Sequence, residues 1–121
     1  MPYRCLSPES YEGMKVGSGQ CVEFVQKCTV APMASSWRKG PIVKGNISIS
    51  RGTAIATFDA AGRYPNHSTG NHAAVYLGQD TTGIWVYDQW MAKGFVGKRH
   101  IRFKGTPGMS SNDGDDYFVI E

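Results

Sequence analysis

The sequence predicts an α+β fold, with N-terminal helices packed on a small antiparallel sheet. Apolar residues recur with the spacing of an α-helix between residues 20 and 30. From residue 42 onward the pattern changes to a period of two, which is typical of strands. A turn-rich connector at residues 78–83 joins two neighbouring strand patterns, as in an antiparallel hairpin. Helices followed by strands in this order indicate the α+β class.

Length and composition restrict the class of protein further. A chain of 121 residues is long enough for one hydrophobic core, so we expect a single domain over residues 1–121. Hydrophobic residues make up 40% and charged residues 19%, which excludes a largely disordered chain. The 13 basic residues are scattered, and scattered charge argues against a nucleic-acid-binding protein. No apolar stretch approaches membrane-spanning length, so no membrane span is expected.

The first helix is expected over residues 20 to about 30, and Pro32 ends its pattern. Three residues share its apolar face at i, i+4 and i+7: Cys21, Val25 and Cys28. The preceding glycines favour a turn, in which Ser18 is the expected N-cap. A short second helix is expected over residues 34–39, closed by Gly40 and Pro41.

Six strands are expected after the helices, at residues 42–43, 53–58, 73–77, 84–87, 100–103 and 117–120. Residues 62–71 form a polar loop that runs directly into His72. The basic residues at 98–104 alternate as a strand should, which favours a solvated strand face over a binding patch.

Cys21 is the candidate nucleophile. At the start of a helix, unpaired backbone N–H groups and the helix dipole stabilise a thiolate, and the same N–H groups can donate to an oxyanion. The alternative is an inert core cysteine, which is the interpretation favoured for Cys28. Cys21 and Cys28 lie about 10 Å apart along the helix axis, too far for a disulfide. A Cys5–Cys28 bridge stays open from the sequence and would leave Cys21 free.

His72 and Asp88 are the candidate base and base-orienting group. A hairpin from residue 73 to residue 88 brings both to one end, where cross-strand neighbours lie about 5 Å apart. Cys21, His72 and Asp88 then match the nucleophile, base and acceptor of a thiol acyl-transfer enzyme. The alternatives are a buried structural histidine and an ordinary strand-end acid. His67 and His100 are expected at the surface.

Other chemistries fit the sequence less well. Four residues could bind zinc in principle: Cys21, His67, His72 and Asp88. However, neither Cys-x-x-Cys nor His-x-x-x-His spacing occurs. The segment at residues 17–19 lacks the strand and helix context of a nucleophilic serine, and no phosphate-binding Gly-Lys-Ser/Thr follows it. We therefore expect no metal and no cofactor.

The motifs resemble a known group of enzymes. Gly-Gln-Cys at residues 19–21 resembles the signature of CHAP domains, the cysteine, histidine-dependent amidohydrolases/peptidases, and residues 71–75 resemble their Gly-His-Val-Ala strand. Residues 88–90 stand in place of their Glu-Gln-Asn, and NlpC-type peptidases share the same order of groups. The combination is similar to small bacterial proteins allied to the amidase effectors of type VI secretion. The match spans residues 17–90, and asparagine 71, aspartate 88 and Trp90 replace glycine, glutamate and asparagine.

The resemblance implies a papain-like core that hydrolyses peptide or amide bonds of bacterial peptidoglycan. It implies Cys21 as nucleophile, His72 as base and Asp88 as orienter. It also places three residues in the oxyanion or substrate site: Gln20, Asn71 and Gln89. The loop at residues 63–70 is expected to line the cleft. Three tryptophans are expected beside it: Trp37, Trp85 and Trp90.

An antibacterial effector is the function that these expectations favour. Residues 1–8 lack the apolar core of a signal peptide, so export from the cytoplasm by a type VI route into a target cell's periplasm is expected. A toxic wall enzyme of this kind calls for an immunity protein as partner. Two alternatives stay open: a wall-binding module that has lost turnover, and an interaction protein. A competent Cys21–His72 pair discriminates the enzyme from both.

Overall fold

The structure is a computed structural model that describes residues 2–65, 70–105 and 109–121. Over these residues it has the α-helix α1 (Cys21–Thr29) and six strands. The strands are β1 (Lys39–Ile42), β2 (Ala54–Thr57), β3 (Ala73–Gln79), β4 (Gly83–Asp88), β5 (Gly97–Arg102) and β6 (Tyr117–Ile120). Four 3-10 turns complete it: η1 (Pro8–Tyr11), η2 (Ala34–Ser36), η3 (Ser110–Asn112) and η4 (Gly114–Asp116). The predicted α+β class is confirmed.

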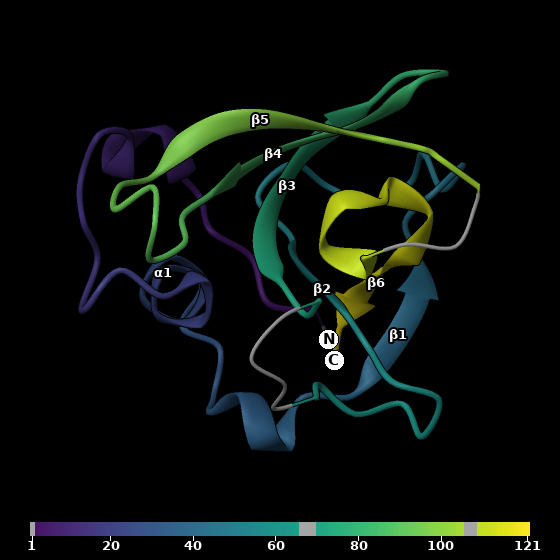
Figure 1. Cartoon of the computed structure of the whole chain (residues 1–121), viewed down its shortest axis with the longest axis horizontal. Coiled ribbons are helices and arrows are strands. Elements are labelled where there is room, and N and C mark those ends of the chain that lie inside the picture. Colours follow the sequence, from purple (N-terminus) through teal and green to yellow (C-terminus); the bar gives the residue numbers. More distant parts are fainter. Residues whose placement is uncertain (1, 66–69, 106–108) are drawn as a thin grey trace.

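The strands form one antiparallel sheet in the order β1-β6-β2-β3-β4-β5. Figure 1 shows the curved sheet with α1 on one side of β3 and the C-terminal η3 and η4 turns on the other. Because both faces are covered, β3 is apolar on both sides over its buried first half, Ala73 to Tyr76. The sheet thus separates two cores.

The core between α1 and the sheet sets the position of the helix. Phe24 and Val25 are fully buried and pack with Ala73, Val75 and Tyr87 of β3 and β4. The alternate strand residues face the second core, on the side of the C-terminal turns. The N-terminal end of α1 is thereby held at the end of the β3–β4 hairpin, where His72 precedes β3 and Asp88 ends β4.

The second predicted helix is wrong. Only a three-residue turn, η2, forms, and Lys39 begins β1. The backbone groups of Arg38 and Glu121 exchange hydrogen bonds of 2.6 and 2.8 Å, which draw this segment onto the edge of the sheet beside β6. This pairing partner lies over 80 residues away in sequence, so local periodicity could not reveal it.

The interpretation of Cys28 as an inert core thiol is also wrong. Cys28 forms a disulfide with Cys5, with 5.1 Å between the two Cα atoms, and Cys21 is free. The bridge ties the N-terminal segment to the last turn of the helix that carries Cys21. The sequence had left this pairing open.

Candidate active site

Cys21 is the first residue of α1, as predicted, and its side chain is partly exposed. The N-cap is Gln20, whereas Ser18 was expected. The hydroxyl and backbone N–H of Ser18 donate to the Glu23 carboxylate, which also accepts the backbone N–H of Gln20 at 3.2 Å. Glu23 therefore holds the turn that leads into Cys21, the candidate nucleophile.

Gly17 is required for this turn to close. Its φ of 59° is the left-handed conformation that side chains disfavour, and a Cβ here would run into the Glu23 carboxylate. Gly17 thus allows the Glu23 carboxylate to approach the backbone of this turn. The contact fixes where the helix begins.

Gln89, which the sequence places in the oxyanion or substrate site, also fixes this turn. The side chain is fully buried. Its amide oxygen accepts the Val16 N–H at 3.1 Å, and its amide nitrogen donates to the carbonyls of Val16 and Gln20 at 2.9 and 2.8 Å. Both polar groups of Gln89 are thus bonded to backbone, and the residue positions the Cys21 turn against the end of β4.

His72 is held rigidly before the start of β3. Its backbone N–H donates to the Thr57 hydroxyl at 3.0 Å, and its carbonyl accepts the Thr57 N–H at 3.0 Å. The imidazole is buried, and its Nε2 lies 2.8 Å from Asp88 Oδ2. Nδ1 is therefore the ring nitrogen left to serve Cys21. The hairpin places His72 and Asp88 side by side, as the sequence predicted.

Asp88 is fully buried and is shared among three cationic side chains. Besides His72, Arg99 donates through Nε and Nη2, each 2.8 Å from Oδ2, and Lys93 Nζ lies 3.2 Å from Oδ1. Burial raises the pKa of the Asp88 carboxyl, but the His72 hydrogen bond and the three nearby positive charges outweigh it and hold the pKa below its ordinary value. Asp88 is thus an ionised acceptor at neutral pH.

Cys21 and His72 shift each other's pKa in opposite directions. Burial raises the pKa of the Cys21 thiol, but the His72 hydrogen bond and charge, the Tyr64 hydroxyl and the Ala73 N–H together lower it below its ordinary value. Burial lowers the pKa of His72, whereas Asp88 and the Cys21 thiolate raise it to about 9. Cys21 and His72 therefore each favour the charged form of the other, and the thiolate is the form in which cysteine nucleophiles attack.

Tyr64 is a site residue whose chemistry the sequence did not reveal. Its hydroxyl lies 3.7 Å from Cys21 Sγ and accepts a 3.3 Å hydrogen bond from Asn71 Nδ2. Burial and the nearby thiolate raise the pKa of the hydroxyl far above neutrality, so it stays protonated. The sequence placed Tyr64 in the cleft-lining loop, but its contact with Cys21 depends on the path of that loop. Asn71 Oδ1 is buried without a partner in the described part of the chain.

The three tryptophans take different places. Trp90 packs edge-to-face on His72 with ring centroids 6.2 Å apart, and Lys93 and Arg99 lie over its ring at 4.4 and 5.1 Å. Trp37 is fully buried and supports Tyr64, with centroids 5.1 Å apart. The remaining tryptophan, Trp85, is 38% exposed and packs on the partly buried His100. Trp90 therefore contacts the candidate base His72 directly, and Trp37 reaches the candidate site through Tyr64.

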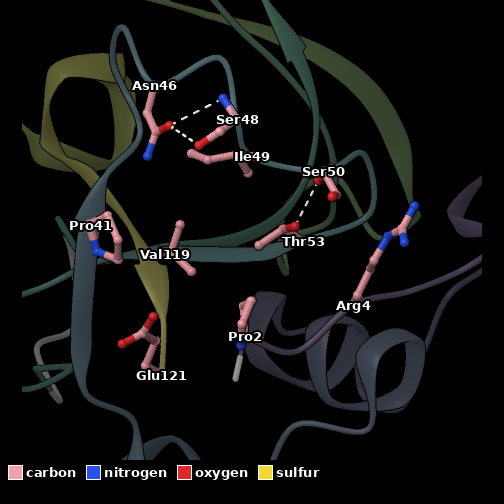
Figure 2. A pocket seen from close by; sticks show the side chains of 10 residues that line it. All are labelled: Pro2, Arg4, Pro41, Asn46, Ser48, Ile49, Ser50, Thr53, Val119 and Glu121. Atoms are coloured by element: carbon pink, nitrogen blue, oxygen red, sulfur yellow. Dashed lines mark hydrogen bonds between the residues drawn. The ribbon is translucent and has the colours of Figure 1, made fainter.

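Other features of the surface lie apart from these groups. His67 falls outside the described residues. Within the described ranges no three His, Cys, Asp or Glu side chains converge as a metal site, and no helix has the length and apolarity to cross a membrane. A hollow of about 380 Å³ lies beside both chain ends. Its lining includes Pro2, Asn46 and Glu121 (Figure 2). Its lining includes no candidate catalytic residue.

Comparisons with known proteins identify relatives of this chain. The family model described as domesticated amidase effector 2 matches residues 1–120. A type VI secretion amidase effector 2 protein of Salmonella typhi is 46% identical over 134 aligned residues, covering both chains fully. A domesticated amidase effector 2 of Ixodes scapularis is 37% identical, covering 97% of this chain and 83% of its own. A solved structure of type 6 secretion amidase effector 2 superimposes with a TM-score of 0.86 at 45% identity, covering 98% and 94%.

Proposed function

This chain belongs to the domesticated amidase effector 2 family, and on that basis we propose that it is a cysteine amidase that hydrolyses peptide amide bonds of bacterial peptidoglycan. The observation that carries the proposal is the His72 imidazole, bonded through Nε2 to buried Asp88 and paired through its other side with the free Cys21 thiol. The relatives are named amidase effectors, which supports amide hydrolysis, and the resemblance of the motifs to cell-wall peptidases supports peptidoglycan as the substrate.

The geometry supports a two-step acyl transfer. The Cys21 thiolate attacks the amide carbon, and the carbonyl electrons move to oxygen. As this oxyanion collapses, the C–N bond breaks, and Nδ1 of His72 gives its proton to the leaving amine. Neutral His72 then takes a proton from water, which attacks the thioester and releases the acid, while the thiolate and imidazolium are restored. Asp88 holds the ring throughout.

Groups around Cys21 serve binding and charge stabilisation. Cys21 is the first residue of α1, so its backbone N–H has no partner within the helix. This N–H and the helix dipole can stabilise negative charge that develops beside the thiol. Gln20 is exposed at the N-cap, where its side chain is available to substrate. Asn71 remains a candidate substrate-site residue through Tyr64, whose hydroxyl accepts a hydrogen bond from Asn71 Nδ2.

We extend the proposal to ancestry and delivery. The order of Cys21, His72 and Asp88, with Nε2 toward the acid, supports membership of the CHAP and NlpC-type superfamily with its papain-like core. The relative from Salmonella typhi is a type VI secretion effector, which supports delivery of this chain by that route into a target periplasm. An immunity protein that covers the Cys21 site is then the expected partner in the producing cell.

Purified muropeptides test the proposed function. The protein is incubated with cross-linked muropeptides, and the products are analysed by mass spectrometry. We expect products heavier by one water at a single type of amide bond. Cys21→Ala should abolish cleavage and leave the thermal midpoint within about 5 °C, because the thiol is partly exposed. A wild-type protein without cleavage, or an active Cys21→Ala variant, would contradict the proposal and favour a binding module.

A further inference from the structure

The hydroxyl of Tyr64 has one hydrogen bond that defines its direction. Asn71 Nδ2 donates to the hydroxyl oxygen, so the phenolic proton is not needed in that contact and is free to point elsewhere. Cys21 Sγ lies 3.7 Å from the same oxygen, within reach of a hydrogen bond to sulfur. The chain Asn71 to Tyr64 to Cys21 therefore directs a neutral O–H at the reacting sulfur.

The ring that carries this hydroxyl is firmly held. Trp37, itself fully buried, packs against it edge-to-face with centroids 5.1 Å apart. Asn71 in turn directly precedes His72, whose backbone is bonded on both sides to Thr57. Tyr64 thus approaches the thiol from the loop before β3, whereas the N–H of Cys21 belongs to the start of α1.

We propose that Tyr64 is a catalytic residue that donates its hydroxyl proton as a hydrogen bond to the oxyanion formed when Cys21 attacks. This inference deepens the proposed function and rests on it. In the resting site the O–H donates to the thiolate. When the C–S bond forms, negative charge leaves sulfur for the carbonyl oxygen, which lies within about 3 Å of the sulfur. The O–H follows that charge without transferring its proton, and returns to sulfur when the thioester is hydrolysed.

Burial makes this donor effective. Desolvation and the thiolate charge raise the pKa of the hydroxyl, so it stays a neutral donor across the working range of the enzyme. A donor aimed in advance at developing charge in a water-poor site stabilises the transition state more than the ground state. Asn71 acts through Tyr64 and is a positioning residue in this respect, since it fixes which way the hydroxyl proton points.

Two reagents separate an oxyanion donor from a group that merely tunes the thiol. Iodoacetamide alkylates the thiolate by direct displacement and forms no oxyanion. p-Nitrophenyl acetate acylates the same thiol through a tetrahedral oxyanion and releases p-nitrophenol, so the acyl burst reports oxyanion stabilisation without peptidoglycan. Tyr64→Phe keeps the ring on Trp37 and removes the hydroxyl alone. Tyr76→Phe is the matched control, because its buried hydroxyl accepts from Gln79 at 3.0 Å in the other core.

For Tyr64→Phe we expect the acyl burst to slow at least about tenfold more than alkylation, and muropeptide kcat to fall about 10²- to 10³-fold with little change in KM. Asn71→Ala alone should slow the acyl burst. Added to Tyr64→Phe it should have little further effect, because Asn71 acts through the Tyr64 hydroxyl. Tyr76→Phe should leave the acyl burst, the rate of alkylation and the muropeptide kcat unchanged.

Three results would overturn the inference. One is an equal slowing of acylation and alkylation in Tyr64→Phe, which would limit the hydroxyl to tuning the thiol. A second is an unchanged acyl burst in that variant, and a third is additive burst losses for the Tyr64 and Asn71 variants. A wild type that acylates normally but leaves muropeptides intact would instead contradict the proposed substrate, because the acyl burst still tests Tyr64 by itself.

Discussion

Breaking the Cys5–Cys28 bridge is expected to lower the free energy of unfolding by about 3.5 kcal/mol. The two cysteines are 23 positions apart in sequence. A cross-link over a loop of this length removes about 11.5 cal/mol/K of chain entropy from the unfolded state, which gives this figure at 25 °C. For a domain of this size the loss corresponds to a thermal midpoint lower by about 10–20 °C.

Three variants under oxidising conditions test this magnitude: Cys5→Ser, Cys28→Ser and the double substitution. Both side chains are buried, at 4% and 8% exposure, so each serine also places a hydroxyl in the core. If the bridge dominates, each single variant loses about 3.5 kcal/mol or somewhat more, and the double variant loses little beyond a single one. Urea unfolding at equilibrium measures all three, and a reductant should bring the wild type close to the single variants.

Two packed thiols without a bridge would behave differently. Their substitution costs would add, and a reductant would leave the wild type unchanged, so either result would refute the reasoning. The candidate active site gives a second readout, because Cys28 lies in the last turn of the helix that begins with Cys21. Well below its lowered midpoint the Cys5→Ser variant should keep Cys21 reactivity, and near that midpoint it should lose both reactivity and activity.

Two further predictions concern the catalytic groups. Iodoacetamide should alkylate Cys21 of the folded protein at a lower pH than it alkylates an ordinary thiol, because the Cys21 pKa is lowered. A labelling curve against pH that matches a free thiol would contradict this shift. Hydrolysis should decline as pH rises through about 9, the raised pKa of His72. Above this pH the imidazole loses the proton that it must give to the leaving amine. Asp88→Asn should move that alkaline limit to lower pH and reduce kcat by about 10- to 10⁴-fold. The same variant should lose about 3 kcal/mol of stability, because Arg99 and Lys93 lose their buried anion, and urea unfolding beside the pH–rate curve checks both effects.

The elements that local pattern determines were predicted well. The helical spacing from Cys21 to Cys28 predicted α1, and two apolar segments on either side of the turn-rich connector predicted the β3–β4 hairpin. That hairpin was enough to place His72 beside Asp88, since its register follows from the strands and the turn. Local signals therefore located the groups of the candidate site that lie at element ends.

Contacts between distant segments were not predictable in the same way. The sequence places Gln89 in the oxyanion or substrate site by its motif alone, but its side chain binds backbone of the Cys21 turn more than 65 positions away. Tyr64 reaches Cys21 across 43 positions, through a loop without periodicity. The edge strand β1 exists because β6 pairs with it. In each case the position of the residue or strand depends on a segment far away in the sequence, and local sequence patterns do not reveal such contacts.

The cations around Asp88 show why such distant contacts matter for the proposed mechanism. In the resting site the His72 imidazolium balances the buried carboxylate, but acylation passes the His72 proton to the leaving amine. Asp88 would then be a fully buried anion beside a neutral ring, and burial alone favours its protonation. Arg99 and Lys93 keep positive charge beside the Asp88 carboxylate in both halves of the catalytic cycle. Asp88 therefore stays ionised when His72 must act as a base toward water, and can stabilise the imidazolium as it forms again.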